Sequence, residues 1–320
     1  MEPTQTPVSQ PIPTPSPAPT LVLTGPVELF SSSWKFFKQH AKTLIPIVIL
    51  PSIISFISLL FITSGSGLAI LGLILTIAAV IVSIAMQPAA VDAVQRLGAD
   101  PAALLTVQGQ YKTGFKYFWP LVLAIIIQLF VVLGSTVVFI IPGIIMSVYV
   151  SLYIFALIVD NKRGFAALIE SYTLVKGRWW GVLGRMLFLA LIYVVAAFVM
   201  VGITFLINTI FGFGSTSSGQ GIVSSLLNLL MNAIMGPVTL IYVYKLYVSL
   251  KSTRRADTVP GAFKKWLIAS ICVGVLAVIT LPIVGGILAV RFAKSFSANM
   301  AQQQQIIDAL SQQASTTIPN

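Results

Sequence analysis

The sequence predicts an all-α fold, a polytopic bundle of about six to seven transmembrane helices with amphipathic helices at the membrane surface. Three observations lead to this prediction. The 320 residues are 57% hydrophobic and 8% charged, with a mean hydropathy of +0.97, which is too apolar for a water-soluble domain. Seven stretches approach or exceed the roughly 20 apolar residues that cross a bilayer. Most of the basic residues lie between alternate pairs of these stretches.

The chain divides by composition into three predicted parts. Residues 1–26 contain eight prolines, so we expect a disordered cytoplasmic tail of polyproline type. This tail would be either a solvated spacer or a ligand for an SH3-like or WW-like protein partner. Residues 27–290 form the membrane domain, and residues 291–320 form a polar, Gln-rich C-terminal tail. An apolar cluster of Ile306, Ile307 and Leu310 in that tail would allow a short amphipathic helix.

Seven spans follow from the apolar stretches. We expect them at about 43–63, 67–86, 119–141, 143–159, 186–210, 222–244 and 266–290. Three of the connections carry no charge, namely 64–66, the Pro142-Gly143 pair and 211–221. We expect tight turns at these three places, on the side of the membrane opposite the basic residues.

Charge placement predicts the orientation, because Lys and Arg near span ends stay in the cytoplasm. If the first six spans form three hairpins, 17 of the 19 Lys and Arg residues fall on one side. The predicted location is therefore the cytoplasmic (inner) membrane, with a cytoplasmic amino terminus. Arg291 and Lys294 follow the seventh segment. We favour one crossing for that segment, although Pro282 and Gly285-Gly286 would also suit a re-entrant path.

A repeated pattern precedes three of the hairpins, at residues 28–47, 104–123 and 167–186. Lys38, Lys112 and Lys176 occupy equivalent positions in the three segments. The apolar residues recur at helical spacing, so each segment should be an amphipathic helix lying in the headgroup plane. The candidate contacts to anionic lipid headgroups are Lys35, Lys38, Lys42, Lys112, Lys116, Lys176 and Arg178. Ordinary positive-inside anchoring is the alternative interpretation of these residues.

The stretch 141–186 resembles the membrane domain of glycerophosphoryl diester phosphodiesterases and related bacterial membrane proteins. The resemblance depends on Pro142-Gly143, Asp160, Ser171, Lys176-Gly177 and Trp179. It implies a helical membrane module, which in some members is joined to a soluble phosphodiesterase barrel.

We expect no enzyme activity, no metal and no cofactor. Diester hydrolysis of the kind found in that family needs His and carboxylates around a divalent cation, whereas His40 is the sole histidine and the eight acidic residues are scattered. Cys272 is the sole cysteine, which excludes a disulfide within the chain.

The sixth span carries uncharged polar and small residues on one helical face. They are Ser225, Asn228, Asn232, Gly236 and Thr239. This stripe could line a path for a solute or lipid, or it could be a packing seam in which Asn bonds to neighbouring helices at about 0.6 kcal/mol each. No Asp, Glu, Lys, Arg or His lies in the middle of a span, which disfavours transport driven by protons or ions.

Two functions remain as hypotheses. The first is a non-enzymatic membrane protein that organises lipids, anionic ones above all, or partner proteins through its basic helices and tail. The alternative is a channel or transporter for an uncharged or amphiphilic solute along the stripe of the sixth span. No nucleic-acid partner is expected, because the net charge of +11 is spread over a chain embedded in lipid.

Overall fold

The computed structural model describes residues 23–64, 67–211, 217–253 and 261–316, and all of their regular structure is helical. Residues 1–22 of the predicted Pro-rich tail and 212–216 of the predicted 211–221 turn lie outside the described residues. The helices are α1 (Pro26–Thr63), α2 (Ala69–Ala99), α3 (Val107–Lys116), α4 (Phe118–Val138), α5 (Ile140–Val150), α6 (Tyr153–Val159), α7 (Phe165–Val175), α8 (Trp179–Phe211), α9 (Ser217–Ser252) and α10 (Gly261–Thr316). The tail was predicted to extend to Pro26, but α1 begins at that residue, and residues 217–221 of the predicted turn belong to helix α9. The predicted all-α class is confirmed.

Seven helical segments within the described chain are long and apolar enough to cross a membrane. They correspond one to one with the predicted spans, and α5 and α6 together form the fourth. The protein is therefore a multi-pass membrane protein.

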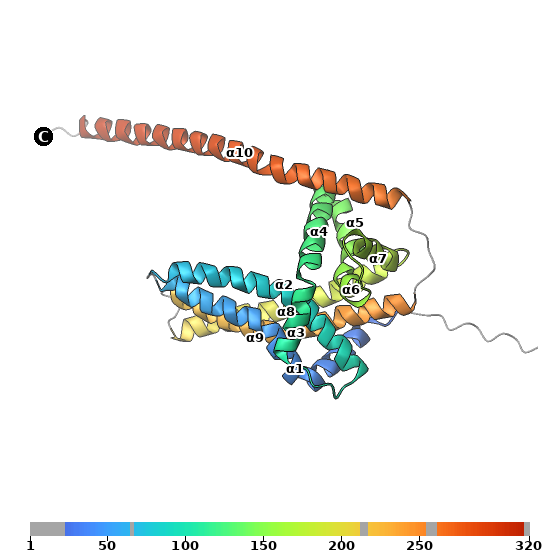
Figure 1. The fold of residues 1–320 in the computed structure, drawn as a ribbon. Helices are drawn as coiled ribbons and strands as arrows, with labels where there is room; N and C mark the ends of the chain where they lie inside the picture. Colours follow the sequence, from blue (N-terminus) through green and yellow to red (C-terminus); the bar gives the residue numbers. More distant parts are fainter. Residues whose placement is uncertain (1–22, 65–66, 212–216, 254–260, 317–320) are drawn as a thin grey trace, which may run out of the picture.

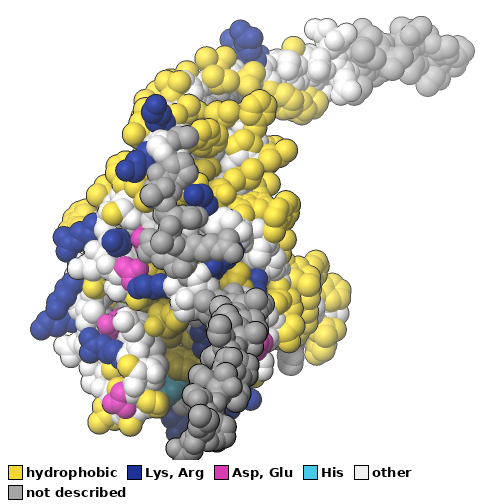
Figure 2. Space-filling view, turned by 90° about the vertical axis from the view of Figure 1, so that its right-hand side faces the viewer, with side chains coloured by type: hydrophobic (Ala, Val, Ile, Leu, Met, Phe, Trp, Pro, Cys, Tyr) yellow, Lys and Arg dark blue, Asp and Glu magenta, His cyan; other side chains and the backbone are white. Residues whose placement is uncertain are grey.

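Helices α1, α2, α8 and α9 run side by side, and α1 packs against both α2 and α9 (Figure 1). The start of α1, the end of α2, the start of α8 and the end of α9 lie at one end of this bundle, which we call the basic end. Figure 2 looks onto this end and shows many Lys and Arg side chains spread across it. In a helical hairpin the start of the first helix lies beside the end of the second, as is seen here for α1 with α2 and for α8 with α9.

The first amphipathic segment is continuous with the first span. Helix α1 has 38 residues, with a kink at His40, where φ is −117° and ψ is 16°. The buried face of its first turns, which includes Leu29, Ser33 and Phe37, continues into that of the span at Leu44. No separate interfacial helix forms here, because one side of the helix packs on protein over its whole length.

The second segment forms a separate helix, α3, as predicted. Its Tyr111 hydroxyl donates a hydrogen bond of 2.8 Å to the carbonyl oxygen of Ile47 in α1. Gly114 lies so close to α2 that a methyl group in its place would be 3.1 Å from Cβ of Ala89. The buried side of α3 thus packs on α1 and α2, and its exposed side carries Lys112 and Lys116.

The prediction of a surface helix is wrong for the third segment. Helix α7 is buried on most of its circumference, and it packs against α5, α6, α4 and α9. Its predicted apolar face includes Leu168 and Val175, but Ala167 and Ser171 on other sides are buried as well. Small residues on several faces let neighbouring helices approach closely, so α7 lies inside the protein.

The turn expected at Pro142-Gly143 is also in a different place. The chain turns at Phe139, which is extended with φ −160° and ψ 147°. Pro142 falls in the first turn of α5, where the absent N–H would have no helical partner. Gly143 contacts α4, since a methyl group there would lie 2.9 Å from Cα of Thr136.

The fourth span is interrupted between α5 and α6. The Ser171 hydroxyl of α7 accepts a hydrogen bond from the Leu152 backbone N–H (3.1 Å) and donates one to the carbonyl oxygen of Tyr149 (2.7 Å). Backbone groups at membrane depth need such partners, because no water replaces them. One side chain of α7 thus supplies partners for two backbone groups at the break.

Helix α10 packs on α4 and then extends away from the bundle (Figure 1). Its first turns are held by Phe263, whose ring stacks on Tyr172 with centroids 3.5 Å apart. The helix is continuous through Pro282, as a single crossing requires. The side chains from 278 to 305 are exposed to the surroundings of the protein. The predicted C-terminal tail continues this helix, and the side chains of Ile306, Ile307 and Leu310 lie outside the described residues.

Candidate functional site

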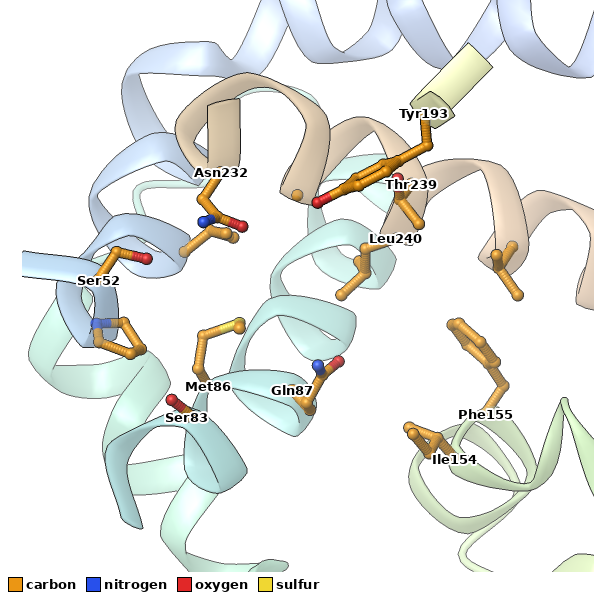
Figure 3. A pocket seen from close by; sticks show the side chains of 14 residues that line it. Ser52, Ser83, Met86, Gln87, Ile154, Phe155, Tyr193, Asn232, Thr239 and Leu240 are labelled. Atoms are coloured by element: carbon orange, nitrogen blue, oxygen red, sulfur yellow. The ribbon is translucent and has the colours of Figure 1, made fainter. Parts of the chain in front are cut away.

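A cavity of about 420 Å³ lies between α1, α2, α6, α8 and α9 (Figure 3). Its apolar wall includes Met86, Phe155 and Leu240. Its polar lining consists of Ser52, Ser83, Gln87, Tyr193, Asn232 and Thr239. A volume of several hundred Å³ with a mostly apolar wall and a few polar groups is typical of small-molecule sites.

Helix α9 contributes one face to this cavity. Asn232, Gly236 and Thr239 lie at i, i+4 and i+7 and therefore share that face. Gly236 brings α9 close to α1, because a methyl group in its place would lie 2.8 Å from Cγ1 of Val48. The Asn232 side-chain nitrogen donates to the carbonyl oxygen of Asn228 (3.0 Å). In Figure 3, Asn232 lies across the cavity from Met86 and Gln87 of α2.

A second cavity of about 420 Å³ lies between α8 and α9. Tyr193 lines both cavities, so the two adjoin at this side chain. The polar lining of the second cavity includes Asn208, Ser224 and Asn228. Among the described residues, no Asp, Glu, Lys, Arg or His lines either cavity. The chemistry available in both is uncharged hydrogen bonding beside apolar contact.

Each cavity contains one buried oxygen without a hydrogen-bond partner among the described residues. These atoms are Oγ1 of Thr239 and Oδ1 of Asn208. A buried polar atom normally has a partner, and leaving it unpaired costs about 1–3 kcal/mol. A polar group bound beside Thr239 or Asn208 would supply the partner that the buried oxygen lacks.

The predicted stripe is only partly brought into this site. Asn232 and Thr239 line the first cavity and Asn228 lines the second, whereas Ser225 lines neither. Ser83 lies on a face of α2 that carries Gly72, Thr76 and Ala79 at helical spacing, a ladder that the sequence predicts to be a packing seam. The sequence analysis missed Tyr193 and Gln87.

The predicted headgroup contacts divide into two groups. Lys35, Lys38 and Lys42 of α1 and the two lysines of α3, Lys112 and Lys116, are exposed. Lys176 is half-buried, and Arg178 donates to both the side chain and the backbone oxygen of Thr253. Arg178 thus joins the start of α8 to the end of α9, which differs from its predicted role at a lipid surface.

An ion pair that the sequence analysis did not single out joins α6 to α9. Lys251 and Tyr247, one helical turn apart, both donate to the carboxylate of Asp160, with a Tyr247 distance of 2.6 Å. Burial by itself would raise the pKa of Asp160, but the hydrogen bonds from Lys251 and Tyr247 and the charge of Lys251 together hold it below its usual value. The arrangement stabilises the basic end of the bundle.

The described part of the chain holds no group of three or more His, Cys, Asp or Glu side chains that could bind a metal ion. Comparisons with protein families, with curated proteins and with solved structures found no match. The resemblance to the phosphodiesterase membrane domain therefore stays a prediction.

Proposed function

We propose that this protein binds an uncharged or amphiphilic molecule in the two adjoining cavities beside α9 and lets it pass along that helix. The observation that carries the proposal is the pair of buried, unpaired oxygens of Thr239 and Asn208. Each belongs to a cavity large enough for a small molecule or part of a lipid.

The electrostatics of the lining support an uncharged ligand group. Moving a full charge into a low-dielectric cavity needs an opposing charge, and neither cavity has one. The absence of Asp, Glu, Lys, Arg and His from the described lining of both cavities also supports passive passage, because coupling to an ion gradient commonly uses such a charged group.

The cavity-lining polar residues of α9 are far enough apart for a bound molecule to extend through about half of the hydrocarbon layer. Eleven residues separate Asn228 from Thr239, a rise of about 16 Å in a helix. This is about half of the roughly 30 Å hydrocarbon layer. A bound amphiphile could therefore place its polar group at Thr239 and its chain along the second cavity.

Photolabelling of the reconstituted protein tests the proposal. A photoactivatable diacylglycerol should label α9, and excess unlabelled diacylglycerol should compete. Asn232→Leu together with Thr239→Val should reduce the competed labelling about tenfold, since the polar partners are removed. Ser225→Ala is the matched control on the same helix. Equal competed labelling of the double variant, at unchanged thermal stability, would refute the proposed site.

The exposed lysines of α1 favour a second candidate function, the organisation of anionic lipids around the basic end. In this proposal the basic end and the amino terminus face the cytoplasm. Each lysine near an anionic surface contributes about 1 kcal/mol. Replacing Lys35, Lys38 and Lys42 by Gln should remove any preference for phosphatidylglycerol over phosphatidylcholine among the lipids retained on purification. A preference that survives this change would exclude these lysines.

A further inference from the structure

A third pocket, of about 620 Å³, opens at the basic end of the bundle. It lies between the start of α1, the end of α2 and the last turns of α9, and it shares no lining residue with the two cavities described above. We call it the Lys245 pocket, because Lys245 is the one charged residue that lines it within the described chain.

The Lys245 ammonium is half-buried and has a neutral environment. It donates one hydrogen bond of 2.8 Å to the carbonyl oxygen of Ser32 and lies 5.6 Å from the centroid of the Phe36 ring. No carboxylate of a described residue lies within ion-pair distance of it. An ammonium has three N–H donors, so Lys245 can still donate to an anion in the pocket.

Other cations at the same end are already engaged by the protein. Lys251 pairs with Asp160, and Arg96 pairs with Asp92 at 2.8 Å. The Arg185 guanidinium donates to three carbonyl oxygens, those of Leu23, Thr24 and Gly181, at 2.7 to 2.8 Å. Lys245 thus differs from these three residues in combining partial burial with unused donors.

The remaining lining suits a phosphoryl group. Gln95, Tyr244 and Ser249 supply amide and hydroxyl donors around Lys245, and no Asp or Glu lines the pocket. Val248, whose side chain is 43% exposed, adds an apolar edge. A lysine acts on a phosphate as a point charge, and hydroxyl and amide groups complete the contacts to its oxygens.

We propose that the Lys245 pocket binds a phosphoryl group, carried either by a phospholipid headgroup or by a soluble phosphate. The site is independent of the uncharged cavities, so it stands or falls separately from the proposed function. Lys245 supplies the charge, and the donors of α2 and α9 orient the phosphoryl oxygens.

Thermal-shift titrations of the full-length protein in an uncharged detergent test the proposal, because a bound ligand stabilises the folded state in proportion to its affinity and concentration. The ligands are dihexanoyl phosphatidic acid, inorganic phosphate and, as the probe that lacks phosphate, dihexanoylglycerol. We expect phosphatidic acid to bind through Lys245, whereas a shift by dihexanoylglycerol, which the proposed function places in the uncharged cavities, should be the same in Lys245→Met as in the parent. Inorganic phosphate that competes would identify the phosphoryl group alone as the ligand, whereas phosphate that does not compete would identify the lipid.

Three variants locate the site. Lys245→Met should weaken phosphatidic acid binding at least tenfold through loss of a charge-assisted hydrogen bond, and Lys245→Arg should retain most of it. Lys265→Met, at an exposed lysine on α10 outside the pocket, is the matched control and should leave the affinity unchanged. Equal affinity of Lys245→Met and the parent for phosphatidic acid, or an equal weakening of dihexanoylglycerol binding by Lys245→Met, would overturn the proposal.

A further variant and a salt titration keep the test decisive if Lys245→Met does not fold. Ser249→Phe fills the pocket while leaving Lys245 unsubstituted, and it should also weaken binding about tenfold. Raising the salt concentration should weaken the binding of phosphatidic acid to the parent protein, because the attraction is ionic. Unchanged binding in Ser249→Phe, or binding that is insensitive to salt, would equally overturn the proposal.

Discussion

The contact between α4 and α10 depends on two glycines that face each other. A methyl group at Gly134 would lie 2.8 Å from the carbonyl carbon of Ser270 and 2.7 Å from the backbone nitrogen of Gly274. A methyl group at Gly274 would in turn lie 2.9 Å from the carbonyl carbon of Phe130. Beside them, the Ser135 hydroxyl donates to the Ser270 hydroxyl at 3.1 Å. Small residues of this kind let helix backbones touch within a membrane.

Gly134→Ala should separate these two helices. Carbon atoms in contact lie about 3.5–4.0 Å apart, so the carbonyl carbon of Ser270 alone requires the backbones to part by roughly 0.7–1.2 Å. The carbonyl oxygen of Ser270 would lie closer still to the new methyl group and requires a larger separation. The Ser135–Ser270 distance would then rise to about 4 Å, which is beyond a hydrogen bond. Overpacking of this size costs about 1–3 kcal/mol. The expected result is a weaker α4–α10 contact in an otherwise folded protein.

Cysteine cross-linking measures that contact. In a Cys272→Ala background, Ser135→Cys and Ser270→Cys place two sulfurs within reach of the roughly 2 Å disulfide bond. Maleimide-polyethylene glycol attaches to free thiols and slows the protein on a gel. Mild oxidation should join the two thiols and so prevent this change in mobility. Adding Gly134→Ala should slow this cross-linking about tenfold.

The control for this experiment is Gly286→Ala on α10, where a methyl group would have no neighbour within 4 Å. It should leave the cross-linking rate unchanged. If Gly134→Ala cross-links as fast as the parent, the two glycines do not determine the contact and the reasoning fails. If the parent pair does not cross-link at all, α10 does not pack on α4 as described.

Three further changes test other contacts in the detergent-solubilised protein. Ser171→Ala should lower the free energy of unfolding by about 1–3 kcal/mol, because two backbone groups at the helix break lose their partner. The control, Ser147→Ala, should lower it by less than about 0.5 kcal/mol. Equal effects of the two substitutions would contradict the role of Ser171. Because the folded-state pKa of Asp160 lies below its ordinary 3.8, its stabilising effect is complete above that value and is lost as pH falls through the folded-state pKa. The unfolding temperature of the parent should therefore fall more steeply below about pH 4 than that of Asp160→Asn, and parallel curves would exclude this linkage. Tyr111→Phe should cost about 1 kcal/mol in chemical unfolding, since the carbonyl oxygen of Ile47 loses its donor, and a neutral effect would show that α3 is held by packing alone.

The candidate site was predictable in part. Asn228, Asn232 and Thr239 repeat on one face of one helix, so their periodicity alone predicted a shared polar surface. Periodicity could not decide whether that surface meets a cavity or a packed neighbour. Tyr193 of α8 and Gln87 of α2 belong to no predicted polar face, so their part in the lining appears only in the folded bundle.

The errors in the predicted fold have a common cause. The amphipathic pattern of α7 was interpreted as a membrane-surface helix, because a helix with one apolar face suits both lipid and protein neighbours. Ala167 and Ser171 resolve this ambiguity only once the surrounding helices are in place. Likewise, Pro142 and Gly143 are common in turns, but here they form the first turn of a helix that packs against α4.

Local composition was sufficient to predict the all-α class and the seven spans, because the transfer of an apolar stretch into hydrocarbon depends on the residues of that stretch alone. The tertiary structure decided the break in the fourth span, the burial of α7, the lining of the cavities and the neutral environment of Lys245. Each of these depends on atoms from helices far apart in the chain, such as Ser171 beside Leu152 and Lys245 beside Ser32. Helices in lipid are held together by close packing and hydrogen bonds rather than by apolar burial, so their partners are determined by three-dimensional complementarity that no single stretch encodes.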